Sequence, residues 1–296
     1  MGPDVEMLVG TAWLGDRLGD PDIVVVDMRW REDGSARALY DAGHIPGAVF
    51  LDWSTDLVDH AHPVAFMLAP PDVFAVAMEA AGIGDDAHVV AYSDEFGSGP
   101  FRLWWGSRRY GHANVSVLDG GFGKWNAEGR PISRDRPRPA PASWTPGSAE
   151  GLVAVAGEVL SARTADDVVV IDSRPAEQYH GRAVWFETGQ IPAGPDGIAH
   201  TPRGDVRAGH VPWAANIPAS DLYRTDLTMK DPEELRAMLE DAGVREGSRA
   251  ITYCGVGISA SAMLFAIVRA GVDDVSLYDP SWEEWGRDPD KPVVRD

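Results

Sequence analysis

The 296-residue sequence predicts an α/β protein of two tandem domains, each a parallel sheet with helices on both faces. A set of short blocks recurs in the same order in the two halves, about 150 residues apart, which indicates two homologous domains rather than a solenoid. Each half alternates apolar runs with helical patterns, and a proline-rich stretch separates the halves. We therefore expect a first domain at residues 1–133, a linker at 134–150 and a second domain at 151–296.

The repeat consists of four pairs of blocks. The first pair reads Ile-Val-Val-Val-Asp-Met-Arg at 23–29 and Val-Val-Val-Ile-Asp-Ser-Arg at 168–174. The other pairs are 43–46 with 209–212, 89–93 with 250–254, and 116–125 with 276–285. Because the order is the same in both halves, we expect the two domains to share one topology.

Short runs rich in β-branched residues predict buried parallel strands, since a strand covered on both faces is apolar throughout. These runs are 23–26, 89–92, 168–171 and 250–253. Segments with helical patterns alternate with them, at 70–81, 101–110, 232–242 and 259–270. Pro70 and Pro232 fit the starts of two of these helices, where a missing N–H leaves no hydrogen bond unmade. Alternating strands and helices imply a parallel sheet covered on both sides.

The stretch 134–141, with three prolines, predicts an extended, solvated linker.

The composition excludes several classes of function. Forty-six acidic residues against 26 basic ones give a net charge of −20, which disfavours binding to nucleic acid or to anionic membranes. No apolar run reaches the roughly 18 residues that span a bilayer, and the N-terminus lacks a secretory signal pattern. A single cysteine permits neither an intrachain disulfide nor a multi-thiolate metal site. The same cysteine count leads us to expect no metal and a reducing, cytoplasmic environment. No dinucleotide or P-loop motif is complete, so we expect no cofactor.

The two halves differ at two places. Ser93 in the first half stands where Cys254 stands in the second. In addition, 66 positions separate Asp27 from Ser93 but 82 separate Asp172 from Cys254, so the second half carries about 16 extra residues, within 180–207. We expect the segment 185–207, which is rich in glycine and proline, to be either a lid over a pocket or a loop for a partner.

The surroundings of Cys254 point to a nucleophile. The residue follows a buried strand, and ligand sites in open α/β sheets lie at the carboxyl ends of strands. Gly255-Val256-Gly257-Ile258-Ser259 then leads into a helix that begins near Ser259. Two glycines allow tight curvature with the backbone N–H groups turned inward, and these dipoles and the helix N-terminus stabilise a thiolate. We therefore expect Cys254 to attack substrates at neutral pH.

Together these motifs resemble the two-domain sulfurtransferases of the rhodanese family over nearly the whole chain. The matching segments are 43–48, 101–105, 116–125, 172–174, 209–212, 254–259 and 278–285. The resemblance implies two rhodanese-like domains, the second catalytic and the first without its cysteine. It also implies sulfane-sulfur transfer: Cys254 takes sulfur from a donor as a persulfide and passes it to cyanide, a thiol or a thioredoxin-like acceptor.

The loop after Cys254 bears on the donor. Family members that use thiosulfate tend to carry basic residues there, whereas this loop is uncharged and resembles that of 3-mercaptopyruvate sulfurtransferases. The sequence differs from the 3-mercaptopyruvate enzymes at two positions. Val256 stands where those enzymes have a serine, and Gln178 stands where they have one of two arginines that bind the donor. The second donor-binding arginine of the family aligns with Arg203. Arg182, four residues after Gln178, is a candidate to replace the positive charge that is missing at Gln178. We expect 3-mercaptopyruvate to be the preferred donor, with Gly255 to Ser259, Arg182 and Arg203 as its binding residues.

Other functions remain as alternatives. If the donor is the thiosulfate dianion, the protein is a thiosulfate:cyanide sulfurtransferase. If the protein does not turn over donor and acceptor, it is a non-catalytic sulfur carrier. Dual-specificity phosphatases share this fold by analogy, but their loop is longer by one residue and ends in a phosphate-binding arginine. No arginine follows Cys254 before Arg269, which argues against a phosphatase.

Overall fold

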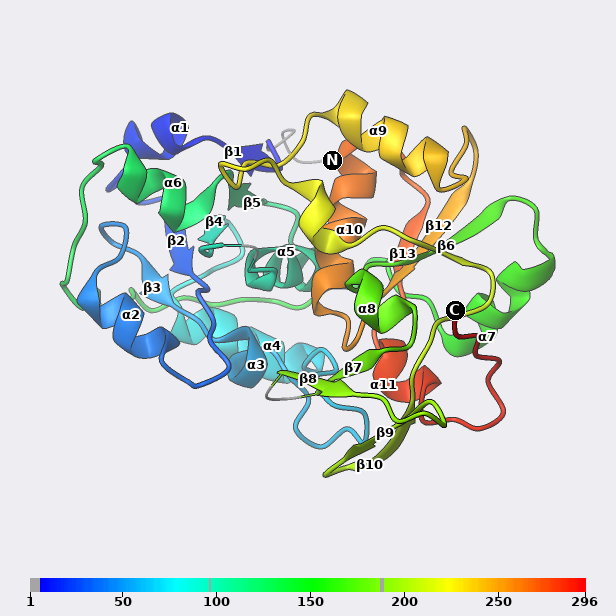
Figure 1. Cartoon of the computed structure of the whole chain (residues 1–296). Helices are drawn as coiled ribbons and strands as arrows, with labels where there is room; N and C mark the ends of the chain where they lie inside the picture. The colour runs from blue at the N-terminus through cyan, green and yellow to red at the C-terminus, as the bar shows by residue number, and fades with distance from the viewer. Residues whose placement is uncertain (1–5, 96, 187–188) are drawn as a thin grey trace. The chain divides into compact units, whose positions relative to one another are not determined.

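The computed structural model describes residues 6–95, 97–186 and 189–296, in two compact units. Unit 1 consists of Met1–Asp59, Leu68–Glu150 and Tyr223–Met229, and unit 2 of His60–Met67, Gly151–Leu222 and Lys230–Asp296. Each unit is thus built mainly from one half of the chain and includes one short segment of the other half. Figure 1 labels most helices and strands of both units.

Unit 1 contains a five-stranded parallel sheet in the order β1-β5-β4-β2-β3. The strands are β1 (Leu8–Val9), β2 (Ile23–Asp27), β3 (Val49–Phe50), β4 (His88–Tyr92) and β5 (Val115–Leu118). The helices are α1 (Thr11–Gly15), α2 (Ala36–Ala42), α3 (Trp53–Asp56), α4 (Pro71–Ala80), α5 (Gly99–Arg109) and α6 (Gly121–Ala127). Proline in the first turn of α4 and the apolar runs of β2 and β4 lie where the sequence predicts them.

Unit 2 repeats this plan with a four-stranded parallel sheet in the order β11-β6-β12-β13. The strands are β6 (Val168–Asp172), β11 (Ala214–Asn216), β12 (Arg249–Tyr253) and β13 (Val275–Leu277). The helices are α7 (Ala156–Ser161), α8 (Ala176–Tyr179), α9 (Pro232–Asp241), α10 (Ile258–Arg269) and α11 (Ser281–Trp285), with 3₁₀ turns at Ala162–Thr164 and Ala219–Leu222. The predicted α/β class with two repeated parallel sheets is confirmed.

The extra segment of unit 2 has a structure that the sequence did not predict. It forms two antiparallel hairpins, β7 (Ala183–Phe186) with β8 (Gly189–Pro192) and β9 (Ile198–Thr201) with β10 (Gly204–Arg207). The guanidinium group of Arg207 donates to the backbone carbonyls of Gly286 and Lys291, at 3.3 and 2.8 Å. This charged group therefore attaches the second hairpin to the C-terminal segment of the same unit.

Helix α10 is largely buried and packs against β12, β13 and α9. Nine of its twelve residues are buried, because its sequence is apolar all round and such a helix is stable only inside a core. Its N-terminus follows the carboxyl end of β12, so the chain turns from strand to helix within the loop after Tyr253. The fold thereby places the Cys254 loop at the end of a central strand.

The stretch 134–150 groups with unit 1 and contains no helix or strand. Its first half is mostly exposed, but Trp144 is buried and packs its ring against Phe74 and Tyr110. The Thr145 N–H and hydroxyl groups both donate to the carboxylate of Asp85. The second half of this stretch is therefore anchored to unit 1 by one tryptophan and one threonine.

Among the described residues, no helix combines the length and the apolar character needed to cross a membrane.

Candidate active site

Cys254 directly follows β12 and is 2% exposed. Its N–H donates to Oγ of Ser281 at 3.1 Å, and its carbonyl accepts the N–H of Trp282 at 2.9 Å. Both partners belong to α11, which follows β13. The thiol-bearing residue is thus held by hydrogen bonds on both sides of its own backbone.

The loop from Gly255 to Ser259 presents unpaired backbone donors. Gly257 adopts the left-handed conformation at φ 80° and caps α10, which begins at Ile258, one residue before the predicted position. Within the described chain, none of the five N–H groups from Gly255 to Ser259 has a hydrogen-bond acceptor. Amides at a helix N-terminus that curve around one point form an anion-binding concavity. The loop is uncharged, so these dipoles supply its attraction for an anion.

Ser281 holds a backbone conformation that favours glycine. Its φ is 52°, it is fully buried, and its hydroxyl donates to the Tyr278 carbonyl at 2.9 Å while accepting the Cys254 N–H. The corresponding residue of unit 1 is Gly121, also at φ 52°, where no side chain is available. A serine that accepts this strain contributes its hydroxyl, which fixes the position of Cys254. The role of Ser281 was not predictable from the sequence, because the contact depends on the turn after β13.

A buried ion pair supports the strand next to Cys254. Two nitrogens of Arg174 contact the Asp172 carboxylate at distances down to 2.6 Å, and Nη2 also donates to the Gly209 carbonyl at 2.7 Å. The guanidinium carbon of Arg174 lies 4.2 Å from the ring centroid of Trp282. Burial raises the pKa of Tyr253 well above its ordinary value, with the Asp172 charge adding to the shift, so the phenol stays protonated. These groups stabilise the site without lying in the loop itself.

The equivalent loop of unit 1 differs in charge. Ser93 follows β4 as Cys254 follows β12, and its carbonyl accepts the N–H of Phe122 at 2.8 Å. The next residues are Asp94 and Glu95, and Arg31 makes a bidentate contact with Asp94 at 2.7 and 3.0 Å. Arg31 also lies 3.7 Å from the Glu95 carboxylate, so this group has two negative charges against one positive charge, and its net negative charge disfavours an anion.

The two arginines predicted to bind the donor lie on the extra segment. Arg182 is exposed just before β7, and its N–H donates to the Glu177 carbonyl at 2.9 Å. Arg203 is exposed in the turn between β9 and β10. Gln178, which occupies the position of a family arginine, is buried on α8. Both guanidinium groups therefore belong to unit 2, the unit that carries Cys254.

Trp185 is a neighbour of the loop that sequence reasoning missed. A methyl group placed on Gly255 would lie 3.6 Å from Cβ of Trp185, in ordinary van der Waals contact. The ring of Trp185 packs against that of Phe66, with centroids 5.8 Å apart, and Phe66 belongs to the short segment of unit 2 contributed by the first half. No pattern in the sequence places either aromatic ring there. Trp185 therefore lies beside the loop, and Phe66 packs against its ring.

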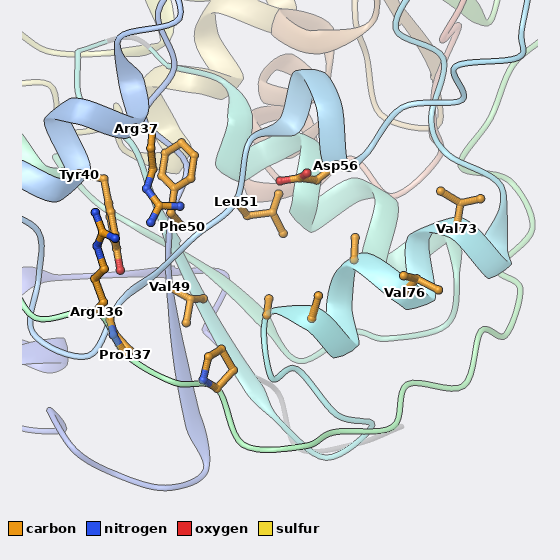
Figure 2. Close-up of a pocket in the computed structure, with 14 residues that line it drawn as sticks. Arg37, Tyr40, Val49, Phe50, Leu51, Asp56, Val73, Val76, Arg136 and Pro137 are labelled. Carbon is orange, nitrogen blue, oxygen red and sulfur yellow. The ribbon is translucent and has the colours of Figure 1, made fainter.

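A separate cavity of about 440 Å³ lies in unit 1. Val73 and Val76 on α4 lie on one side of it, and Arg37, Tyr40 and Arg136 lie on the other (Figure 2). None of the predicted site residues lines it. The described part of the chain also contains no group of three or more His, Cys, Asp or Glu residues arranged to hold a metal ion.

The comparisons with known proteins agree with this geometry. The chain matches the family described as "Rhodanese-like domain" at residues 10–128 and again at 155–288. It is 33% identical over 290 residues to 3-mercaptopyruvate sulfurtransferase of Escherichia coli K12, covering 96% of each chain. It is 33% identical over 289 residues to thiosulfate sulfurtransferase of Rattus norvegicus, covering 95% of this chain and 92% of that one.

A solved structure of a related enzyme has the same fold. The crystal structure of SseA, a 3-mercaptopyruvate sulfotransferase from Escherichia coli, superimposes with a TM-score of 0.79 at 30% identity, over 94% of this chain and 99% of that chain. The two family matches cover residues of both units, and the two relatives named above, matched over more than 90% of their length, are sulfurtransferases. The chain therefore belongs to the rhodanese family, as a sulfurtransferase with two rhodanese domains in tandem.

Proposed function

We propose that Cys254 carries the sulfur during transfer from 3-mercaptopyruvate to a thiol, thioredoxin-like or cyanide acceptor. The Cys254 thiolate attacks the donor sulfur and a sulfur–sulfur bond forms. The donor carbon–sulfur bond breaks, and its electron pair leaves with the carbon fragment, which takes up a proton to give pyruvate. The acceptor nucleophile then attacks the outer sulfur of the persulfide and releases the Cys254 thiolate. The five N–H groups of the loop, which have no acceptor among the described residues, support this proposal, because they stabilise an anionic sulfur before and after loading.

The charge of the loop favours a monoanionic donor. Gly255 to Ser259 provide N–H groups but no cation, so a dianion entering the loop loses hydration without gaining an ion pair there. A carboxylate monoanion keeps its charge at the rim while its neutral sulfur reaches Cys254. Arg203 and Arg182, exposed on the extra segment, are the cations proposed to bind that carboxylate.

Replacing either arginine tests the donor site. A charge-assisted contact to a carboxylate contributes about 1.5–3 kcal/mol. Arg203→Ala is therefore expected to lower kcat/KM for 3-mercaptopyruvate by roughly ten- to a hundredfold, and Arg182→Ala likewise if it substitutes for the arginine lost at Gln178. Steady-state kinetics with both donors measures the effect. Wild-type kcat/KM in both variants would place the carboxylate elsewhere.

Thiosulfate is the second candidate donor. The identity to the rat thiosulfate sulfurtransferase equals that to the bacterial 3-mercaptopyruvate enzyme, 33% in each case. A comparison of kcat/KM for the two donors separates them, and faster turnover of thiosulfate would overturn the argument from loop charge. A chain that accepts sulfur once and does not turn over with cyanide is a sulfur carrier.

Unit 1 is proposed to take no part in the chemistry. Ser93→Ala is expected to leave turnover within about threefold of wild type, because the hydroxyl lies beside two carboxylates in a loop unsuited to anions. A loss beyond tenfold, about 1.4 kcal/mol, would show that this loop participates.

The setting of the reaction follows from the composition. One cysteine and a large negative charge suit a reducing compartment and small-molecule or protein acceptors rather than nucleic acid. We therefore place the proposed activity in the cytoplasm, with no cofactor and no metal.

A further inference from the structure

Glu283 and Arg287 connect the Cys254 loop to the second hairpin. The backbone N–H of Glu283 donates to the Gly255 carbonyl at 3.0 Å. The Glu283 carboxylate pairs with Arg287, whose Nε and Nη2 both lie 2.9 Å from Oε1. All of these residues belong to unit 2. A continuous series of contacts thus leads from the active-site loop to one guanidinium group.

The other side of that guanidinium group holds the turn of the hairpin. Nη1 of Arg287 donates to the carbonyls of Arg203 and Gly204, at 3.0 and 3.1 Å, and Nη2 lies 3.4 Å from Oγ1 of Thr201. The turn therefore has its backbone fixed by a side chain that is itself fixed beside the loop. The planar arginine fork satisfies all these acceptors at once, which a lysine cannot do.

Burial makes this connection firm. The Glu283 side chain is 9% exposed and that of Arg287 is 23% exposed, so the pair is largely shielded from water. The attraction between two charges is stronger when they are shielded from water, whereas ion pairs on the surface contribute little free energy. The pair therefore fixes the position of the turn relative to the Cys254 loop, and Arg203 projects from that turn.

We propose that Arg287 is a positioning residue that fixes Arg203 for binding of the donor carboxylate. The inference rests on the proposed function, since it assigns a role within the same donor site. Arg287 has its donors engaged by Glu283 and by the turn, so it acts through Arg203 rather than on the donor itself. We expect loss of Arg287 to release the turn, whereas the hydrogen bonds from Cys254 to Ser281 and Trp282 do not involve its side chain.

Kinetics of the full-length protein tests this role. Arg287→Ala is expected to raise KM for 3-mercaptopyruvate about tenfold with kcat within threefold, and Arg287→Lys, which keeps the charge beside Glu283, about threefold. The double variant Arg203→Ala/Arg287→Ala should be no worse than Arg203→Ala alone, because both changes remove one interaction. Effects that multiply in the double variant, or a KM unchanged in both single variants, would overturn the proposal.

Arg245 offers a matched control. It is an exposed arginine of unit 2 that also donates to two backbone carbonyls, those of Glu240 and Val244. Arg245→Ala should leave KM and kcat unchanged. An equal rise in KM in this variant would attribute the Arg287 effect to a general loss of structure or of positive charge, and the proposal would be wrong.

Alkylation of the single cysteine separates this inference from the choice of donor. Iodoacetate carries a carboxylate and iodoacetamide does not, so the ratio of their rates at Cys254 measures carboxylate binding without any sulfur transfer. Arg287→Ala and Arg203→Ala should each lower that ratio about tenfold, with the iodoacetamide rate unchanged. If wild-type protein fails to use 3-mercaptopyruvate but the ratio still falls, the proposed donor is wrong and the role of Arg287 stands. If the ratio does not change, Arg287 does not position a carboxylate-binding residue.

Discussion

Replacing Cys254 with serine is expected to reduce sulfur transfer to below one per cent of wild type. A serine hydroxyl has no activating base in this loop and cannot form a persulfide. The N–H groups from Gly255 to Ser259, which have no acceptor in the described part of the chain, are unchanged in this variant, so we expect the loss to fall on the covalent step rather than on binding. Turnover of donor and cyanide by purified Cys254→Ser protein measures it, and residual activity above one per cent, about 3 kcal/mol of barrier, would contradict the assignment.

Moving the thiol to unit 1 provides the matched control. In the double variant Ser93→Cys/Cys254→Ser the thiol follows β4 instead of β12, in a homologous strand. It then lies beside Asp94 and Glu95 rather than in an uncharged loop, so no recovery of activity is expected. Recovery to near wild-type turnover would show that a thiol at the end of either strand is sufficient and that loop charge has no effect.

Removing Arg174 is expected to destabilise unit 2 by about 3–5 kcal/mol, because Asp172 would remain as a buried carboxylate without its partner. The pair is almost completely shielded, with 2% and 0% side-chain exposure, so solvent cannot compensate for the loss. Arg174→Met keeps most of the apolar volume next to Trp282 and isolates the electrostatic part. Urea unfolding followed by circular dichroism measures the change in the free energy of unfolding.

Two comparisons test the cause of that loss. Asp172→Asn/Arg174→Met should be more stable than Arg174→Met alone, because the double variant leaves no uncompensated charge. Arg245→Ala, on the surface of the same unit, should change the free energy of unfolding by no more than about 0.5 kcal/mol. If the double variant were as unstable as Arg174→Met, packing against Trp282 rather than charge would explain the effect.

The sequence predicted those parts of the fold that depend on local patterns. Strands such as β2 and β12 are built around short runs rich in apolar residues, and the helices α4 and α9 begin with proline, so their positions could be read from local sequence patterns. The hairpins of the extra segment were missed, because their strands are only four residues long and β8 and β10 contain glycine, proline or charged residues. Their pairing depends on contacts such as those of Arg207, which no local pattern shows.

The candidate site was predictable where one residue identified it. Cys254 stood out because it is the single thiol and lies at a strand end where the homologous half has serine. The residues that surround it were not predictable, since Ser281 and Trp185 reach the loop from other elements. The two arginines were chosen from alignment and spacing, which place them on one segment but do not fix where their side chains act.

The mass of the intact protein after incubation with 3-mercaptopyruvate is the most direct test of Cys254 as the sulfur carrier. Wild-type protein is expected to gain the mass of one sulfur atom, located by peptide mapping on Cys254 and removed by cyanide. Cys254→Ser protein should gain nothing under the same conditions. Turnover by wild-type protein that never shows this added mass, or an equal gain in Cys254→Ser protein, would contradict transfer through a Cys254 persulfide.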